Sequence, residues 1–204
     1  MIAGSPPAPD PGLTDPAARS DAELLAAHVA GDPDAFAALV ERHRDRLWAV
    51  ALRTMRNPED AADALQDAYL SAFRRADSYR GDAAVTTWLH RVVVNACLDR
   101  LRVLRSRAAD PLPEHLDVDP DLAVTPPDPV ETEEERAEVA AALGHLNPDQ
   151  RAALVLVDMQ GYSVDEAAQI LGCAAGTVKS RCARGRARLA PLLADRQLSP
   201  GRET

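Results

Sequence analysis

The sequence predicts an all-α protein in which two small helical domains are joined by a flexible acidic linker. Of its 204 residues, 46% are hydrophobic, which is enough for a core, yet only 3% are aromatic. Alanine, leucine and valine recur throughout the chain, and this composition favours helices over sheets. A stretch rich in proline and acid separates two segments with helical periodicity, which indicates two domains.

Residues 21–106 are predicted to be the first domain, following a proline-rich disordered tail at 1–20. Two helix starts are well signalled, because Asp32 and Asn57 each stand before a proline that fits the first turn of a helix. Between the last two helices, Gly, Asp and Ser indicate a loop. The helices are expected at 21–30, 33–55, 58–76 and 86–105, with the loop at 77–85.

The segment 107–130 is predicted to be the linker. Ten acids stand against Arg107 alone between 107 and 135, so this part carries a charge of −9, equal to the net charge of the whole chain. Six prolines interrupt any helix here, and the like charges keep the chain extended. This composition fits either a solvated tether or a segment that lies in a basic groove of a partner.

Residues 131–194 are predicted to be the second domain, and 195–204 a tail. Ser163 and Glu166 have the spacing of a capping box, and Gly172 ends the short helix that they begin. A short helix, a tight turn and a long basic helix form the helix-turn-helix pattern. The four helices are expected at 131–143, 147–160, 163–171 and 175–193.

The last of these helices carries a charge of +5 between 173 and 189, without a single acid. A helical wheel places one narrow apolar stripe on it and leaves the basic side chains on the rest of its surface. Such arginines suit phosphates and guanine edges, although arginines can also simply solubilise a surface helix. The stripe consists of Val178, Cys182, Gly185 and Leu189, and the basic residues are Lys179, Arg181, Arg184, Arg186 and Arg188.

Several classes of protein are excluded by what the sequence lacks. It has no apolar run long enough to span a membrane, and no signal peptide in Met1–Ser20, so we expect a cytoplasmic protein without membrane insertion. Cys97, Cys173 and Cys182 follow neither a disulfide nor a metal pattern, and the five histidines lack zinc-ligand spacing. Phosphate loops and nucleophile elbows are also missing, so we expect no cofactor, no metal, no catalytic residue and no enzyme activity.

Three motifs stand in order along the chain. Residues Glu59–Arg74 are EDAADALQDAYLSAFR, residues Thr87–Arg102 are TWLHRVVVNACLDRLR, and Val164–Leu189 has GTVKSR, Gly176–Arg181, at its centre. Together they resemble the extracytoplasmic-function (ECF) sigma factors, which form group 4 of the sigma-70 family of bacterial initiation factors. The resemblance covers 21–106, which corresponds to sigma region 2, and 131–193, which corresponds to region 4.

The resemblance implies an alternative sigma factor that binds core RNA polymerase, recognises −10 and −35 promoter elements, and initiates transcription of a stress or developmental regulon. The implied partners are promoter DNA, the clamp helices of the largest polymerase subunit, the flap of the second-largest subunit, and an anti-sigma factor. It also implies that the acidic linker passes near the RNA exit path. The residues implied in core-polymerase binding are Asp63, Gln66, Asp67 and Leu70.

For the −10 element, the resemblance implies that the loop from Tyr79 to Val85 receives an extruded base. Asn95 would bond a nearby base, Arg91 would meet phosphate, and Trp88 would stack at the edge of the bubble unless it is a core aromatic. Val85 departs from the family, which often has an aromatic residue there. The implied −10 residues are Tyr79, Arg80, Gly81, Asp82, Trp88, Arg91 and Asn95.

For the −35 element, the resemblance implies contacts from the last helix. Ala183 and Gly185 are smaller than the usual family residues, which would either loosen specificity or let the helix approach closely. The implied −35 residues are Gly176, Thr177, Lys179, Ser180, Arg181 and Arg184.

An alternative hypothesis is a stand-alone helix-turn-helix regulator, in which 21–106 would be a sensor or dimerisation module. It accounts for the basic helix but not for the Trp88 and Asn95 pattern. A regulator must bind duplex DNA alone, which a sigma factor typically does not.

Overall fold

The computed structural model describes residues 18–108 and 133–197, and every regular element in these two ranges is helical. The first range holds four α-helices and a short 3₁₀ turn, η1, and the second holds four α-helices and a π-helical turn, η2. The predicted all-α class is therefore confirmed. The tail at 1–17 and most of the acidic linker lie outside the described residues. The bounds are α1 Asp21–Val29, α2 Ala35–Met55, α3 Pro58–Arg74, η1 Ala76–Ser78, α4 Val85–Ala108, α5 Glu133–Gly144, α6 Pro148–Leu154, η2 Val155–Met159, α7 Val164–Leu171 and α8 Ala175–Gln197.

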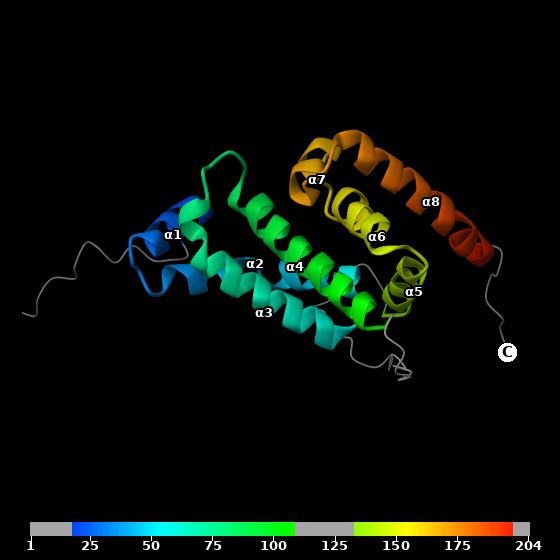
Figure 1. Ribbon diagram of the computed structural model, residues 1–204, viewed down its shortest axis with the longest axis horizontal. Coiled ribbons are helices and arrows are strands. Elements are labelled where there is room, and N and C mark those ends of the chain that lie inside the picture. The colour runs from blue at the N-terminus through cyan, green and yellow to red at the C-terminus, as the bar shows by residue number, and fades with distance from the viewer. Residues whose placement is uncertain (1–17, 109–132, 198–204) are drawn as a thin grey trace, which may run out of the picture.

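The first group of helices packs around α2, α3 and α4, which contact one another along their lengths (Figure 1). Apolar side chains from each helix meet in the interior, and burial of each contributes roughly 1.5–3 kcal/mol to folding before the entropy of ordering is subtracted. Helix α1 lies across one end of the group, against α2. The most deeply buried side chains here include Leu24, Leu39, Leu47, Val50, Leu89 and Val94.

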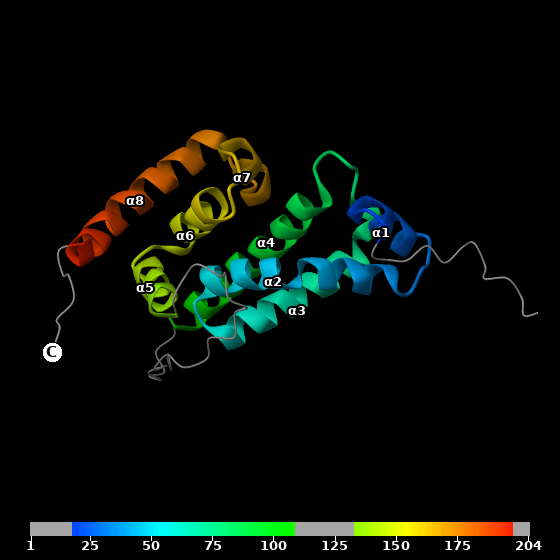
Figure 2. The same ribbon diagram turned by 180° about the vertical axis from the view of Figure 1, so that it is seen from behind.

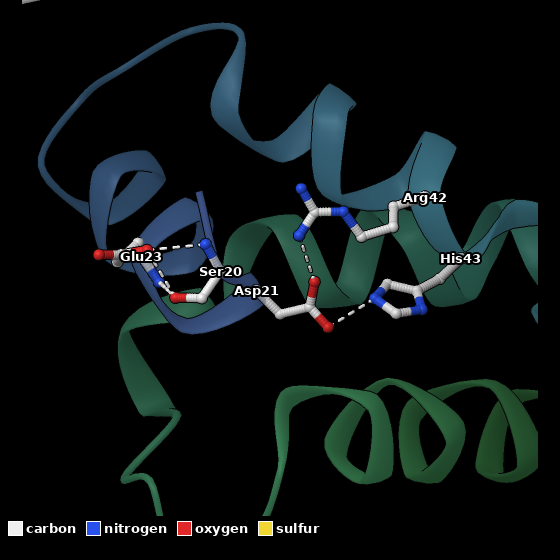
Figure 3. A network of polar contacts seen from close by, with 5 residues as sticks. All are labelled: Ser20, Asp21, Glu23, Arg42 and His43. Atoms are coloured by element: carbon white, nitrogen blue, oxygen red, sulfur yellow. Dashed lines mark hydrogen bonds and ion pairs between the residues drawn. The ribbon is translucent and has the colours of Figure 1, made fainter. Parts of the chain in front are cut away.

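Polar contacts fasten α1 to α2 (Figure 3). Ser20 and Glu23 form a capping box at the start of α1, each bonding the other's backbone N–H. The next residue, Asp21, accepts from Arg42 at 2.8 Å and lies 2.7 Å from the Nε2 atom of His43. One carboxylate in the first turn of α1 thus holds two side chains of α2 and fixes the angle between the helices.

The second group packs α6 and α7 against α8, while α5 lies at the end of the group. Its interior is formed mainly by apolar side chains of α6, η2, α7 and α8. Asn147 caps α6 by accepting from the backbone N–H of Gln150, as its position before Pro148 predicts. After α6 the chain changes to the π-helical turn η2, and Gly161, with a φ of +73°, ends the helical conformation.

The two groups contact each other through α2 and α4 on one side and α6, η2 and α7 on the other, and Figures 1 and 2 show α6 between α4 and α8. The junction is partly polar. His90 of α4 is only 1% exposed, and its Nδ1 atom lies 2.9 Å from the Tyr162 hydroxyl oxygen. Arg46 of α2 donates to the Gln160 side chain at 3.0 Å. The two groups therefore pack in a closed arrangement.

Several predicted boundaries are wrong: α4 continues to Ala108 and α8 to Gln197, beyond the predicted ends at 105 and 193. Helix α2 begins at Ala35, and Asp32 does not cap it, because the Asp32 carboxylate instead accepts from Arg19 and from the Asp34 backbone N–H. The predicted helix 147–160 keeps α-geometry only to Leu154. No helix within the described ranges is long and apolar enough to cross a membrane.

Candidate nucleic-acid interface

One exposed face of α3 carries all four residues that were predicted to bind polymerase. Asn57 caps this helix, and Glu59 and Asp60 lie in its first turn, where their charges favour the helix dipole. Its opposite face is buried by small residues such as Ala61 and Ala64, which lets α3 approach α2 and α4 closely. The residues of this exposed face are Asp63, Gln66, Asp67 and Leu70; both Gln66 and Asp67 lie three or four residues from Asp63 and from Leu70.

Asp63 already forms an ion pair with another residue of this chain. Arg100 of α4 donates to Asp63 at 2.5 Å and to Asp60 at 2.9 Å, so one guanidinium bridges two carboxylates of α3. These carboxylates raise the pKa of Arg100 against the opposing effect of its burial. Much of the Asp63 charge is therefore balanced before any partner arrives, and Gln66, Asp67 and Leu70 are the more available members of the face.

Sequence reasoning missed an apolar extension of this face. Phe73 is 51% exposed and Leu70 is 45% exposed, although both side chains are large and apolar. The Phe73 ring meets the edge of Phe36 at a centroid distance of 5.2 Å and lies 4.4 Å from the ring of His28. Its spacing of three residues from Leu70 is the signal that could have revealed it. An exposed apolar pair beside polar side chains is typical of a protein-binding surface.

The loop before α4 is held in shape by its own contacts. The Tyr79 hydroxyl donates to the Ala83 carbonyl at 2.6 Å, and Gly81 turns the chain with a φ of +79°. The Tyr79 and Trp88 rings meet at 5.9 Å with an interplanar angle of 62°. The remaining predicted loop residues, Arg80, Gly81 and Asp82, are exposed. Tyr79 and Trp88 therefore form a pair of contacting aromatic rings next to an accessible loop.

Helix α4 separates a buried face from an accessible one. Leu89, Val93 and Cys97 are at most 1% exposed, whereas Arg91 and Asn95 are exposed. Trp88 is half-buried, so it is neither a fully enclosed core aromatic nor a free platform. Spacings of three and four residues place 88, 91 and 95 on one face of the helix.

Val85, the first residue of α4, is 4% exposed and lies in the core. Its side chain is thus absent from the accessible surface of the loop, and the prediction that it lines a base pocket is not supported. A buried position in the core favours an apolar side chain that packs without leaving a cavity, which is consistent with valine there.

Helices α7 and α8 form the predicted helix-turn-helix. The Ser163–Glu166 capping box begins α7, and Gly172 ends it with a φ of +61°. Ala167, Ala168 and Ile170 bury one face of α7, while Val178 and Cys182 of α8 are at most 2% exposed. The short helix is therefore fixed against the long one at the turn.

The N-terminal half of α8 presents most of its predicted DNA-contacting side chains to solvent. Gly176, Lys179 and Arg184 are exposed, and Thr177 and Ser180 are half-buried. Arg184 donates to the Ser180 backbone carbonyl and hydroxyl oxygens, both at 3.1 Å. This pair orients the guanidinium along the helix, which reduces the entropy lost when it meets a phosphate or a base.

Two other arginines of α8 are already paired inside the domain. Arg181 lies 3.4 Å from the Asp149 carboxylate and is 22% exposed. Arg186 makes two bonds to Asp158, at 2.9 and 2.6 Å. The basic helix is therefore less uniformly free than its sequence indicates, and Arg181 is the least available of the predicted −35 residues.

Gly185 lies on the packed side of α8. A Cβ atom there would approach the Cδ1 atom of Leu154 to 2.6 Å. The glycine therefore lets α8 approach α6 closely. Ala183, by contrast, is exposed.

Comparisons with known proteins agree with this geometry. The family model described as Sigma-70 region 2 matches residues 39–107, and that described as Sigma-70, region 4 matches residues 136–189. The chain is 57% identical over 175 residues to the ECF RNA polymerase sigma factor SigM of Mycobacterium tuberculosis, covering 86% of this chain and 85% of that protein.

Two solved structures are also similar. One is the sigma factor RpoE of Bartonella quintana in complex with the anti-sigma factor NepR, with a TM-score of 0.63 and 27% identity over 79% of this chain and 98% of that one. The other is CnrH in complex with the cytosolic domain of CnrY, with a TM-score of 0.59 and 30% identity over 86% and 97%. This chain belongs to the ECF sigma factors of bacterial RNA polymerase.

Proposed function

We propose that this chain binds core RNA polymerase through the exposed face of α3, recognises promoter DNA through α4 and α8, and thereby starts transcription of a particular set of genes. The observation that carries the proposal is the presence of three separate accessible faces in one sigma-family chain. The α3 face supplies an acid, an amide and exposed apolar side chains, including Phe73. Basic partners around an apolar contact would complement it.

At the −10 element, we assign base capture to the loop 79–84 and the adjoining face of α4. The loop backbone is accessible at Gly81, and Tyr79 and Trp88 supply aromatic surface at its edge. Aromatic stacking contributes about 1–3 kcal/mol per base and requires no particular sequence. Hydrogen bonds from Asn95 would add base preference, and Arg91 would meet the backbone.

At the −35 element, the exposed residues of α8 would enter the major groove in the usual manner of a recognition helix. Arg184 and Lys179 are the strongest candidates, because their cationic side chains are exposed and Arg184 is already oriented. Thr177, Ser180 and the Gly176 backbone would contact phosphates.

The polymerase supplies the chemistry of RNA synthesis in this proposal, and the chain makes or breaks no bond itself. It acts in the cytoplasm, where its polymerase and promoters are found. The solved relatives are each in complex with a second protein, the anti-sigma factor NepR or the cytosolic domain of CnrY. We therefore propose that an anti-sigma factor also holds this chain inactive.

The domain limits follow from the same argument. Region 2 would span 21–106 and region 4 would span 131–194, because the helices form two groups that are separated in the chain by the acidic segment. A stand-alone regulator would need no face on α3 for polymerase, so the exposed Leu70 and Phe73 weigh against that alternative.

The test is size-exclusion co-elution with bacterial core polymerase, together with promoter-fragment binding in the presence and absence of the core. The proposal predicts co-elution and promoter binding that depends on the core. Failure to co-elute, combined with tight duplex binding by the chain alone, would support the stand-alone regulator instead.

A further inference from the structure

Three arginines meet at the junction between the two groups of helices. Arg56 follows the last residue of α2, Arg105 lies in the last turn of α4, and Arg151 lies in α6. Helix α6 contacts both α2 and α4, so the three side chains come from both sides of the junction. Arg151 is 5% exposed, whereas Arg56 and Arg105 are exposed at the rim.

The C-terminal end of α5 lies against two of them. Arg151 donates through Nη1 to the Leu143 carbonyl at 3.4 Å. A Cβ atom added at Gly144 would overlap the guanidinium group of Arg56, so the glycine makes room for that cation. A helix end offers about half a negative charge, which compensates only a fraction of three positive charges.

The remaining positive charge has no counterpart among residues 18–107 and 137–192, where side chains are described. Within them, no carboxylate forms an ion pair with Arg56, Arg105 or Arg151, and the Nε atom of Arg151 is buried without a hydrogen-bond partner. Burial, followed by the charges of Arg56 and Arg105, lowers the pKa of Arg151 to about 10. By contrast, Arg100 and Arg186 each contact a carboxylate within 3 Å.

An uncompensated buried charge typically costs several kcal/mol, and two like charges beside it add to that cost. Guanidinium groups present fixed forks of N–H donors that match the oxygens of a carboxylate or a phosphate. The arrangement thus has the donors, the charge and the buried N–H group that would suit an oxyanion.

We propose that Arg56, Arg105 and Arg151 form an oxyanion-binding site that is complete only when the two domains are closed together. An oxyanion bound there bridges α2 and α4 of the first domain to α6 of the second. It therefore stabilises the closed arrangement, in which the two DNA-binding helices are held at a fixed separation. This site does not depend on the promoter roles proposed above.

The oxyanion has two possible sources with the same chemistry. One is free phosphate. The other is the acidic segment 109–132, which begins one residue after α4 ends and carries six aspartates and glutamates before Glu131. The segment lies outside the described residues, but both of its ends join helices that adjoin the site.

The experiment measures energy transfer between dyes placed at Ala62 of α3 and Ala187 of α8, both exposed, in the full-length chain. The variant Arg56→Gln/Arg105→Gln removes the two rim charges and leaves the buried Arg151 in place. Arg107→Gln is the matched control, because it removes a charge from the same end of α4 that is not among those acting on Arg151.

The direction in which the double variant changes the ratio of closed to open chain tests whether the site holds an anion. If the site holds an anion, the double variant lowers the ratio of closed to open chain by at least about tenfold, because it removes charged hydrogen bonds that hold the anion. If the site is empty, removing two like charges relieves repulsion, and the closed fraction rises or stays constant, which overturns the proposal.

Two further arms distinguish the sources. Sodium phosphate is titrated against sodium chloride at constant ionic strength, with the wild-type chain and with a variant whose acids between 110 and 131 are changed to Asn or Gln. Closure of the wild-type chain by phosphate identifies a free anion. Opening of the neutralised variant, reversed by phosphate, identifies the chain's own carboxylates. If neither treatment changes the closed fraction, the proposal is wrong.

Discussion

The interior of each domain is formed by apolar side chains, whereas the junction between the domains also contains polar and charged side chains. Side chains such as Leu39 and Leu156 are fully buried in the apolar core, which continues through both groups of helices. The junction adds polar contacts to this core: His90 with Tyr162, Arg46 with Gln160, and the arginines around Arg151. Polar groups regain hydrogen bonds to water when surfaces separate, whereas exposed leucines do not regain what they lose. The apolar interiors therefore stabilise the fold, and the polar contacts at the junction allow the two domains to separate.

The largest effect is expected from an interior substitution. Leu39→Ala removes a fully buried side chain of α2 and should lower the free energy of unfolding by about 2–5 kcal/mol, because a cavity remains. Urea unfolding followed by circular dichroism measures it. The matched control, Leu70→Ala, removes an exposed leucine of α3 and should change stability by no more than about 0.5 kcal/mol. Equal losses for the two variants would contradict the assigned interior.

A smaller effect is expected from His90 as the pH falls. Burial chiefly, with the charges of Arg46 and His43, lowers the pKa of His90 to about 4, against a weaker opposing effect of the Thr86 carbonyl. Between pH 6.5 and about 4, the unfolded chain thus binds a proton that the folded chain does not. Stability should therefore decrease as pH falls through this window.

The measurement is the unfolding midpoint as a function of pH for the wild-type chain and for His90→Gln, at constant ionic strength. The variant retains a polar side chain but cannot titrate, so its curve should be flatter across the window. The carboxylate ion pairs are common to both chains and cancel in the difference. Identical slopes would show that His90 is not held neutral by its surroundings.

The smallest effect is expected at the junction hydroxyl. Tyr162→Phe removes the oxygen 2.9 Å from the Nδ1 atom of His90 and should shift the equilibrium between closed and open chain by about 0.5–1.5 kcal/mol toward the open form. Energy transfer between the domains reports it. Tyr69→Phe is the control, because the Tyr69 hydroxyl is buried without a hydrogen-bond partner among the described residues and its removal should be neutral or stabilising. A larger change for Tyr69→Phe than for Tyr162→Phe would reverse the comparison.

Local signals predicted most of the helices, because their causes lie within a few residues. Asn57, Asn147 and the Ser163–Glu166 pair all cap helices where the sequence places them. Asp32 fails because its carboxylate is engaged by Arg19, thirteen residues earlier, and such a pairing cannot be recognised from the capping pattern alone.

In the candidate site too, local features could be predicted from the sequence and contacts between distant residues could not. The exposure of Gln66, Asp67, Arg91 and Asn95 follows from helical periodicity and agrees with the predicted faces. The pairing of Arg181 with Asp149 and the contact of His90 with Tyr162 depend on how distant helices pack, so the sequence did not indicate them. Gly185 illustrates both the predictable and the unpredictable part. The helical wheel placed it on the packed stripe of α8, but it could not show that Leu154 of α6 lies opposite.

The central claim is that docking and promoter recognition lie on separate faces of one chain. Its most direct test compares Gln66→Ala/Asp67→Ala with Arg184→Ala, measuring affinity for core polymerase and, separately, promoter binding by the assembled complex. We predict that the α3 variant loses core binding by about tenfold or more, and that Arg184→Ala retains it but weakens −35 recognition by roughly 1–3 kcal/mol. Equal loss of core binding in both variants would contradict the account.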